Sequence, residues 1–276
     1  MVTVQAPAKI NLTLEVLGKR ADGYREIKSV VQAVALYDTL LIDKAERVAF
    51  ECDMPGWSAE KSALKKVVSA LGGKKGAKIT LKKRIPVMAG LGGDSSDAAA
   101  LLKGLNKIWG LKLSLKKMLS IAGEIGSDVP FFLQGGTALM EGRGEKITII
   151  PAPPEMRVVI VVPDVPDAPG KTARMYAALK KEHFTDGKIT GELVSALHNN
   201  TFDDSLLFNT FENVAYDEFP GLKTYQEHLL KLGAKRVHLA GAGPALYTLF
   251  KEKTGAEDYY KKCIDQKLNA YLAETL

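Results

Sequence analysis

The segment Pro86-Val87-Met88-Ala89-Gly90-Leu91-Gly92-Gly93-Asp94-Ser95-Ser96-Asp97-Ala98-Ala99-Ala100 places a glycine-rich loop directly before an alanine-rich stretch. Glycines at 90, 92 and 93 can adopt positive φ and let backbone N–H groups approach a ligand closely. The positive end of a helix that follows this loop points to the same place, which favours a bound polyphosphate. Glycine-rich loops also occur as plain turns, so the loop alone leaves both interpretations open.

The residues after the loop predict a helix, because Ala98, Leu101, Leu102 and Leu105 recur at helical spacing. Ser95 and Ser96 then lie in its first turn. The loop does not end in Gly-Lys-Ser/Thr as in a Walker A motif, and no acidic residue linked to a second strand is present as in a dinucleotide fold. Both of those nucleotide-binding motifs are therefore excluded.

The length and composition of the chain predict two domains. The chain has 276 residues, of which 46% are hydrophobic and 25% are charged, enough for one large or two modest domains. Pro-Ala-Pro-Pro at residues 151–154 is the strongest break in the pattern. We therefore predict domains at residues 1–152 and 153–276.

Cysteine and apolar patterns indicate the cellular setting. Cys52 and Cys263 are far apart and form no Cys-x-x-Cys or metal-ligand pattern, which is typical of a reducing compartment. Apolar runs are too short to cross a bilayer, and the first residues show no signal pattern. The histidines have no partner at metal-ligand spacing. The sequence predicts a cytoplasmic protein with no membrane contact and no histidine chemistry.

The net charge is +6, and basic residues gather just before the loop with no acid among them: Lys61, Lys65, Lys66, Lys74, Lys75, Lys78, Lys82, Lys83 and Arg84. Such a run is compatible with a nucleic-acid surface, with a solvated helix and edge strand, or with a field that attracts a polyanionic substrate. The run lacks the interleaved aromatic residues that stack on bases. This absence argues against a nucleic-acid surface.

The sequence allows a structural and a functional interpretation for several polar residues outside the loop. Residues 2–17 alternate as a strand that puts Lys9 and Asn11 on one face. Lys9 is either an edge residue whose stem packs while its head reaches water, or it holds phosphates or a reacting hydroxyl together with Asn11. Asp128 either caps the following turn or acts as a base. Tyr24, after an Asp-Gly turn, is either packed on the surface or stacked on a planar ligand.

Three segments taken together resemble the motifs of the GHMP kinases (galactokinase, homoserine, mevalonate and phosphomevalonate kinases). They are Pro7-Ala8-Lys9-Ile10-Asn11-Leu12, the segment at residues 86–100, and Leu239-Ala240-Gly241-Ala242-Gly243-Pro244. Ala21-Asp22-Gly23-Tyr24 and Asp128-Val129-Pro130-Phe131-Phe132 are similar to the members that act on cytidyl-diphospho-methylerythritol.

The resemblance implies an α+β fold in two parts. The N-terminal half would be ribosomal-protein-S5-domain-2-like and the C-terminal half ferredoxin-like, with the active site in the cleft between them. It also implies ATP-dependent phosphorylation of the 2-hydroxyl of cytidyl-diphospho-methylerythritol in the non-mevalonate isoprenoid pathway, with Mg²⁺ and no nucleic acid, by a monomer or homodimer. A mevalonate-, phosphomevalonate- or homoserine-type kinase is the enzymatic alternative, and a basic nucleic-acid-binding protein is the non-enzymatic one.

The resemblance also implies residue roles. Asp128 would take the proton from the substrate hydroxyl, while Lys9, assisted by Asn11, would orient that hydroxyl and stabilise charge on the γ-phosphate. The loop from Pro86 to Ser96 would bind ATP, and Gly241 and Gly243 would complete the pocket. Tyr24 and Tyr176 would sandwich the cytosine. Two positions depart from the family, with Arg25 in place of histidine at the cytosine edge and Asp94 in place of glycine. No residue is assigned as a metal ligand.

Overall fold

The protein consists of two compact units, each built from segments that are far apart in the sequence. The structure, a computed structural model, describes residues 1–73, 75–166 and 170–276. Unit 1 comprises Met1–Ala8, Leu36–Val87 and Gly92–Gly135, and unit 2 comprises Lys9–Ala35, Met88–Leu91 and Gly136–Leu276.

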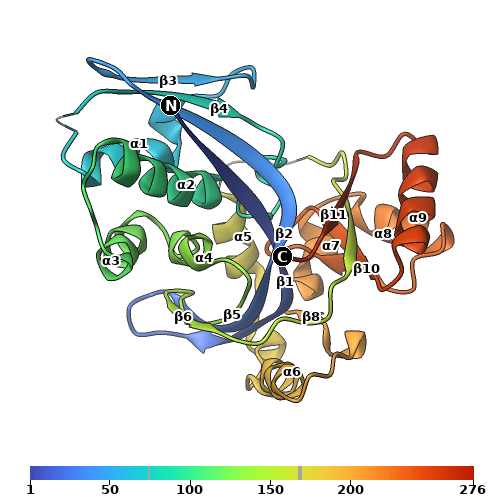
Figure 1. Ribbon diagram of the computed structural model, residues 1–276. Coiled ribbons are helices and arrows are strands. Elements are labelled where there is room, and N and C mark those ends of the chain that lie inside the picture. Colours follow the sequence, from blue (N-terminus) through green and yellow to red (C-terminus); the bar gives the residue numbers. More distant parts are fainter. Residues whose placement is uncertain (74, 167–169) are drawn as a thin grey trace. The chain divides into compact units, whose positions relative to one another are not determined.

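Two long strands, β1 (Val2–Lys19) and β2 (Arg25–Lys44), contribute to both units. The strand order of their sheet is β3-β4-β2-β1-β8, while β5 pairs with β2 and β6 pairs with β5 (Figure 1). The other strands of this sheet are β3 (Val48–Cys52), β4 (Ala77–Lys82), β5 (Thr137–Gly142), β6 (Lys146–Ile149) and β8 (Phe208–Asn209). The predicted strand at residues 2–17 is confirmed. Residues 8–16 are buried throughout, so the polar face of β1 is as buried as its apolar face.

Unit 1 places four helices beside its part of the sheet: α1 (Ala63–Ala70), α2 (Gly93–Ile108), α3 (Leu115–Ile125) and α4 (Val129–Gln134). Ala98, Leu101, Leu102 and Leu105 are buried on α2, as their helical spacing predicts. The helix packs closely on β2, since a Cβ at Gly104 would lie 2.2 Å from Cδ1 of Ile42. This close approach holds the C-terminal part of α2 against β2.

Unit 2 contains a second, antiparallel sheet in the order β11-β7-β10-β9. Its strands are β7 (Arg157–Val161), β9 (His238–Leu239), β10 (Leu246–Phe250) and β11 (Ala270–Glu274). The helices of this unit are α5 (Lys171–Ala178), α6 (Lys188–His198), α7 (Glu212–Glu218), α8 (Leu222–Lys231) and α9 (Lys253–Asp265). Apolar side chains of α5, α7, α8 and α9 share one core with β7 and β10.

The end of the chain differs from what its local pattern indicates. Helical spacing predicts one helix over residues 259–272, but α9 ends at Asp265 and β11 begins at Ala270. Ala270–Glu274 pairs with Val161–Arg157 of β7. The prediction is wrong because pairing with a distant strand, which a local pattern does not contain, decides the conformation of this segment.

Candidate active site

Lys9 and Asn11 point to the same side of β1 and are hydrogen-bonded to each other. Nζ of Lys9 donates to Oδ1 of Asn11 at 2.6 Å, although both side chains are almost fully buried. Burying an ammonium group is costly unless acceptors surround it. The edge-residue reading of Lys9 is therefore wrong: its charged head lies inside the protein and not in water.

The glycine-rich loop (residues 86–96) has three residues with positive φ, a backbone conformation that residues other than glycine rarely adopt. Gly90 and Gly92 have φ of 87° and 74°, and Met88 adopts the left-handed region with φ of 54°. Val87 and Met88 are each 52% exposed, whereas Ala89 and Leu91 are buried. The loop therefore presents backbone and exposed side chains at its tip while it is anchored by its small apolar residues.

In unit 2, the loop lies against the turn at residues 239–244, here called the Gly241 turn. A Cβ at Gly90 would lie 2.0 Å from the carbonyl oxygen of Ala240, and a Cβ at Gly241 would lie 3.0 Å from Nζ of Lys9. The backbone N–H of Lys9 donates to the carbonyl of Leu91 at 3.0 Å. The first motif, the loop and the Gly241 turn, which are far apart in the sequence, thus meet at one place.

Lys171 ties the loop to the Gly241 turn. Its Nζ donates to the backbone carbonyl oxygens of Met88 and Gly243, and its side chain is buried. Asn209 holds the other side of the turn through Nδ2, which donates to the carbonyls of Leu239 at 2.9 Å and Gly241 at 2.8 Å. No local motif marks these two residues, so the sequence alone does not predict their roles.

Helix α2 starts inside the loop, with Gly92 as its N-terminal flanking residue and Ser95 and Ser96 in the first turn. Oγ of Ser96 is buried and has no hydrogen-bond partner among the described residues. A helix of this length directs its N-terminal N–H groups and positive dipole end toward an anion. These features suit the phosphate groups of a nucleotide.

Asp94 binds the N-terminus of α1 in unit 1. Its carboxylate accepts from Oγ of Ser62 at 2.6 Å and from the backbone N–H of Ala63 at 3.0 Å. Ser62 in turn accepts from Leu64 N–H at 3.2 Å, so the two residues together satisfy the N-terminus of α1. The negative charge of Asp94 is thereby held by the N-terminus of α1.

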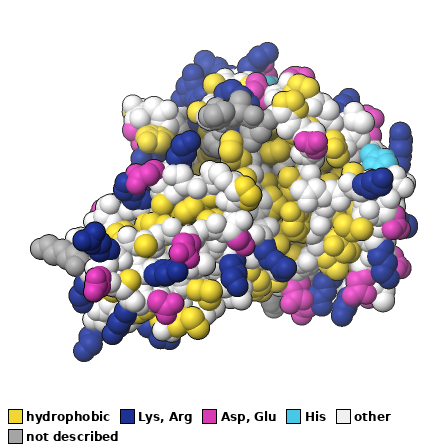
Figure 2. Space-filling view, turned by 90° about the horizontal axis from the view of Figure 1, so that it is seen from above, with side chains coloured by type: hydrophobic (Ala, Val, Ile, Leu, Met, Phe, Trp, Pro, Cys, Tyr) yellow, Lys and Arg dark blue, Asp and Glu magenta, His cyan; other side chains and the backbone are white. Residues whose placement is uncertain are grey.

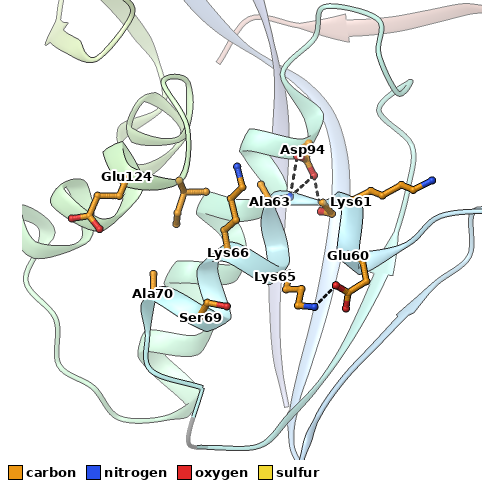
Figure 3. A pocket seen from close by; sticks show the side chains of 11 residues that line it. Glu60, Lys61, Ala63, Lys65, Lys66, Ser69, Ala70, Asp94 and Glu124 are labelled. Carbon is orange, nitrogen blue, oxygen red and sulfur yellow. Dashed lines mark hydrogen bonds and ion pairs between the residues drawn. The ribbon is translucent and has the colours of Figure 1, made fainter. Parts of the chain in front are cut away.

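A pocket of about 490 Å³ lies beside this contact. Figure 3 shows Asp94 of α2 at one end and Glu124 of α3 at the other, with α1 between them. Lys65 is paired with Glu60, and Lys61 and Lys66 also line the pocket. The pocket is thus adjacent to the glycine-rich loop and has charged walls of both signs.

A buried ion cluster supports the start of α2. Lys83 contacts Asp97 at 2.9 Å and also pairs with Asp38, whose Oδ1 accepts from the backbone N–H of Ile85 at 2.8 Å. Burial raises the pKa of Asp97 to about 8 in spite of the Lys83 ammonium. Burial works against the charge of Lys83, but Asp97 and Asp38 outweigh it and raise the pKa of that lysine. The cluster fixes both flanks of the loop in unit 1.

Asp128 precedes α4 in unit 1 and is half-buried. Its side chain makes no capping hydrogen bond to α4, and the N-terminus of that helix carries a proline instead. The helix-cap reading of Asp128 is therefore wrong. Its carboxylate is not used to hold the helix together.

The residues predicted to hold cytosine lie in unit 2. Tyr24 is 55% exposed, and the Arg143 guanidinium lies over one face of its ring at 4.7 Å from the centroid. Arg25 donates from Nη2 to the carbonyl oxygen of Tyr176 at 3.0 Å and lies 5.8 Å from the Phe184 ring centroid. Arg25 therefore links the two predicted aromatic positions through the backbone of Tyr176.

Three members of the basic run before the loop, Lys65, Lys78 and Lys83, are paired with acidic side chains. Lys78 contacts Glu51 at 2.9 Å, and Lys83 is held by the cluster described above. Lys74 lies outside the described residues. On the face drawn in Figure 2, basic and acidic side chains are interspersed. Pairing of this kind lowers the positive field that a nucleic-acid surface requires.

Comparison with known proteins assigns the class. The model of the GHMP kinases N-terminal domain matches residues 59–136, and that of the GHMP kinases C-terminal domain matches residues 175–267. A crystal structure of 4-(cytidine 5'-diphospho)-2C-methyl-D-erythritol kinase superposes with a TM-score of 0.83 at 28% identity, covering 99% of both chains. The fold and the meeting of the three motifs thus define an ATP-dependent kinase of the GHMP class.

Full-length relatives narrow the class to one family. The 4-diphosphocytidyl-2-C-methyl-D-erythritol kinase of Dehalococcoides mccartyi is 44% identical over 100% of this chain and 99% of its own length. The kinase of the same name from Acetivibrio thermocellus is 34% identical, again over 100% of this chain and 99% of its own. This chain belongs to the 4-diphosphocytidyl-2-C-methyl-D-erythritol kinase family. The predicted two-part GHMP kinase fold of mixed α and β content is confirmed.

Proposed function

We propose that this protein transfers the γ-phosphoryl group of ATP to the 2-hydroxyl of 4-diphosphocytidyl-2-C-methyl-D-erythritol, a step of the non-mevalonate isoprenoid pathway. The observation that carries the proposal is full-length similarity at 44% identity to a kinase named for this substrate. The convergence of Lys9, Gly90 and Gly241 in unit 2 supports it, since phosphoryl transfer depends mainly on positioning and on stabilisation of charge.

In the proposed mechanism Asp128 accepts the proton of the attacking hydroxyl. Its carboxylate is suited to this because it does not cap α4 and one positioned carboxylate suffices as a general base. Lys9 stabilises the charge that develops on the transferred phosphoryl group. Its ammonium donates a hydrogen bond to Oδ1 of Asn11, and this bond positions it next to Gly241.

The glycine-rich loop would bind the phosphates of ATP through its backbone N–H groups and the N-terminus of α2. The unpartnered hydroxyl of Ser96 fits a phosphate oxygen or a hydrated cation. Among the described residues, no group of three or more His, Cys, Asp and Glu side chains is placed to hold a metal ion. Mg²⁺ is commonly held by few protein oxygens together with substrate phosphates, and here it would neutralise the charge of the ATP phosphates.

The adenine base would occupy the pocket beside Asp94, since that pocket is adjacent to the end of the loop. Cytosine would stack between Tyr24 and Tyr176, using the face of Tyr24 that Arg143 does not cover. Arg25 would contact the cytosine edge only through N–H groups that its bond to Tyr176 leaves available.

Several wider expectations belong to the same proposal. No helix in the described ranges has the length and apolar character needed to cross a bilayer. We expect a cytoplasmic enzyme that acts on a small molecule as a monomer or homodimer and does not need nucleic acid. The domain boundary after residue 152 stays a prediction. The matched segments 59–136 and 175–267 lie on either side of it.

A coupled assay of ADP release tests the proposal. The purified protein is given ATP, Mg²⁺ and, separately, cytidyl-diphospho-methylerythritol, mevalonate, phosphomevalonate or homoserine. We expect turnover with the cytidyl substrate and at most traces with the others. Preference for one of the other alcohols would reject the substrate while leaving the kinase class intact.

A further inference from the structure

Ser29 is a buried residue of β2 that none of the sequence motifs includes. Its side chain is about 1% exposed. Oγ of Ser29 has two polar neighbours: Nδ2 of Asn11 at 2.8 Å and the backbone carbonyl oxygen of Thr13 at 2.5 Å. Ser29 therefore contacts Asn11 on the side away from Lys9.

The direction of each hydrogen bond in this group follows from simple donor and acceptor chemistry. A carbonyl oxygen only accepts, so the Ser29 hydroxyl must give its single proton to Thr13. The Ser29 oxygen then has only lone pairs left for Asn11 and must receive an N–H from the amide. Oδ1 of Asn11 is thereby turned toward Lys9.

The opposite orientation of the Asn11 amide would be harmful. It would place an NH₂ group against the ammonium of Lys9, and neither group can accept a hydrogen bond. The amide orientation therefore decides whether Asn11 attracts or repels the Lys9 ammonium. Ser29 is the residue that selects between the two.

The surroundings of Ser29 hold this arrangement in place. The side-chain oxygen of Thr13 accepts from the backbone N–H of Val30 at 3.0 Å and from Thr190 Oγ1 at 2.9 Å. The carbonyl oxygen of Asn11 accepts from the hydroxyl of Tyr247 at 2.7 Å. Both strands that carry the network are thus fixed by partners from α6 and β10.

We propose that Ser29 is a positioning residue for phosphoryl transfer. It sets the orientation of the Asn11 amide, and the Asn11 side-chain oxygen in turn positions the Lys9 ammonium for catalysis. Ser29 acts through Asn11 and does not contact the substrate. The proposal rests on the role of Lys9 in the proposed function.

The experiment compares steady-state kinetics of the full-length wild type with Ser29→Ala, Ser29→Cys and Ser29→Thr. Alanine and cysteine remove the strong hydroxyl, and cysteine nearly keeps its volume, whereas threonine keeps the hydroxyl. We expect the first two variants to lower kcat by roughly ten- to a hundredfold, the scale of a misplaced charge-stabilising group. KM for both substrates should stay within about twofold, and Ser29→Thr should recover most of the lost kcat.

A double-mutant cycle with Asn11→Asp separates orientation from packing. A carboxylate offers an oxygen to Lys9 in either orientation, so Ser29→Ala should change kcat by less than about threefold in the Asn11→Asp background. Thr137→Val is the matched control, because it removes another buried hydroxyl bond of the same sheet, to Gln32. It should leave kcat within about twofold of the wild-type value.

Two results would overturn the proposal: Ser29→Ala with wild-type kcat, or a loss of kcat that the threonine variant does not recover. Should Asn11→Asp itself be inactive, the comparison of the cysteine and threonine variants still decides. Lys9→Met distinguishes the two levels of the argument. If Lys9→Met keeps its turnover, the proposed role of Lys9 fails; if it is inactive while Ser29→Ala is normal, only the inference about Ser29 fails.

Discussion

Gly90 of the glycine-rich loop and Ala240 of the Gly241 turn approach so closely that a Cβ at Gly90 would lie 2.0 Å from the Ala240 carbonyl oxygen. Gly90 also has φ of 87°, which side-chain-bearing residues rarely adopt. The obstacle is backbone and not a flexible side chain. Two parts of the proposed ATP site can therefore meet only because position 90 carries no side chain.

Gly90→Ala should displace the loop and weaken ATP binding by at least about tenfold, because phosphate contacts depend on its backbone geometry. Isothermal titration calorimetry with ATP measures this change. Gly123→Ala is the control: Gly123 is exposed within α3, and a Cβ there would meet nothing within 4 Å. ATP affinity of the control should be unchanged, and equal affinity in Gly90→Ala would show that the loop does not bind the phosphates.

Asp128→Asn and Lys9→Met should each reduce kcat by about two orders of magnitude or more, the usual loss for a general base or a charge-stabilising group. Both replacements nearly keep side-chain size. Circular dichroism and ATP titration check that the variants are folded and bind nucleotide. Near-normal turnover of a folded variant at saturating substrate would remove that residue from the mechanism.

Tyr24→Ala should raise KM for the cytidyl substrate by roughly ten- to a hundredfold, since stacking contributes about 1–3 kcal/mol per base. Tyr24→Phe keeps the ring and should stay close to wild type. The uridyl analogue of the substrate tests the edge contact of Arg25, and we expect it to be the poorer substrate. An unchanged KM in Tyr24→Ala would refute the aromatic clamp and would favour a different alcohol as substrate.

Asp94→Ala should destabilise the protein by about 1 kcal/mol, the usual cost of losing an N-terminal helix cap. The carboxylate holds Ser62 and Ala63 at the start of α1. Urea unfolding measures the change, with the exposed Asp258→Ala of α9 as control. Full stability of Asp94→Ala would mean that the contact with α1 contributes nothing, and a rise in ATP affinity would place the carboxylate near the phosphates.

The contribution of Asp97 to stability should fall as pH rises through the neutral range. The pKa of Asp97 is raised by burial from 3.8 to about 8, so between these values the folded state keeps a proton that the unfolded chain has released. More protons bound in the folded state means that the free energy of unfolding decreases with rising pH. Burial lowers the pKa of His238 to about 4, which makes stability rise with pH below about 6.5. Urea unfolding of the wild type at about pH 7 and about pH 8.5, above that range, should therefore show the decrease due to Asp97.

Asp97→Asn imitates the protonated carboxyl group and should flatten the pH dependence of the free energy of unfolding. Lys83 and Asp38 remain as an ion pair in this variant. A pH dependence equal to that of the wild type would show that Asp97 is not the group that titrates.

The sequence by itself determined the features that depend on local spacing and on exact residue types. Helical spacing after residue 97 predicts α2. The glycines at 90, 92 and 241 indicate positions where the backbone has positive φ, which a residue with a side chain rarely adopts. The order of the three motifs predicts a GHMP kinase. Sequence identity over the full length then shows to which family of these kinases the chain belongs. These features are readable because each is encoded by neighbours in the chain.

Only the tertiary structure decided which distant residues hold the site. Ser29 contacts Asn11 across two strands, Lys171 bonds carbonyls of the loop and the Gly241 turn, and Asp94 caps α1. The last strand, β11, formed where local spacing favours a helix, because its partner β7 lies more than a hundred residues away. Hydrogen bonds and ion pairs form between groups that lie within a few ångströms of each other. A sequence pattern does not give the distance in space between residues that are far apart in the chain.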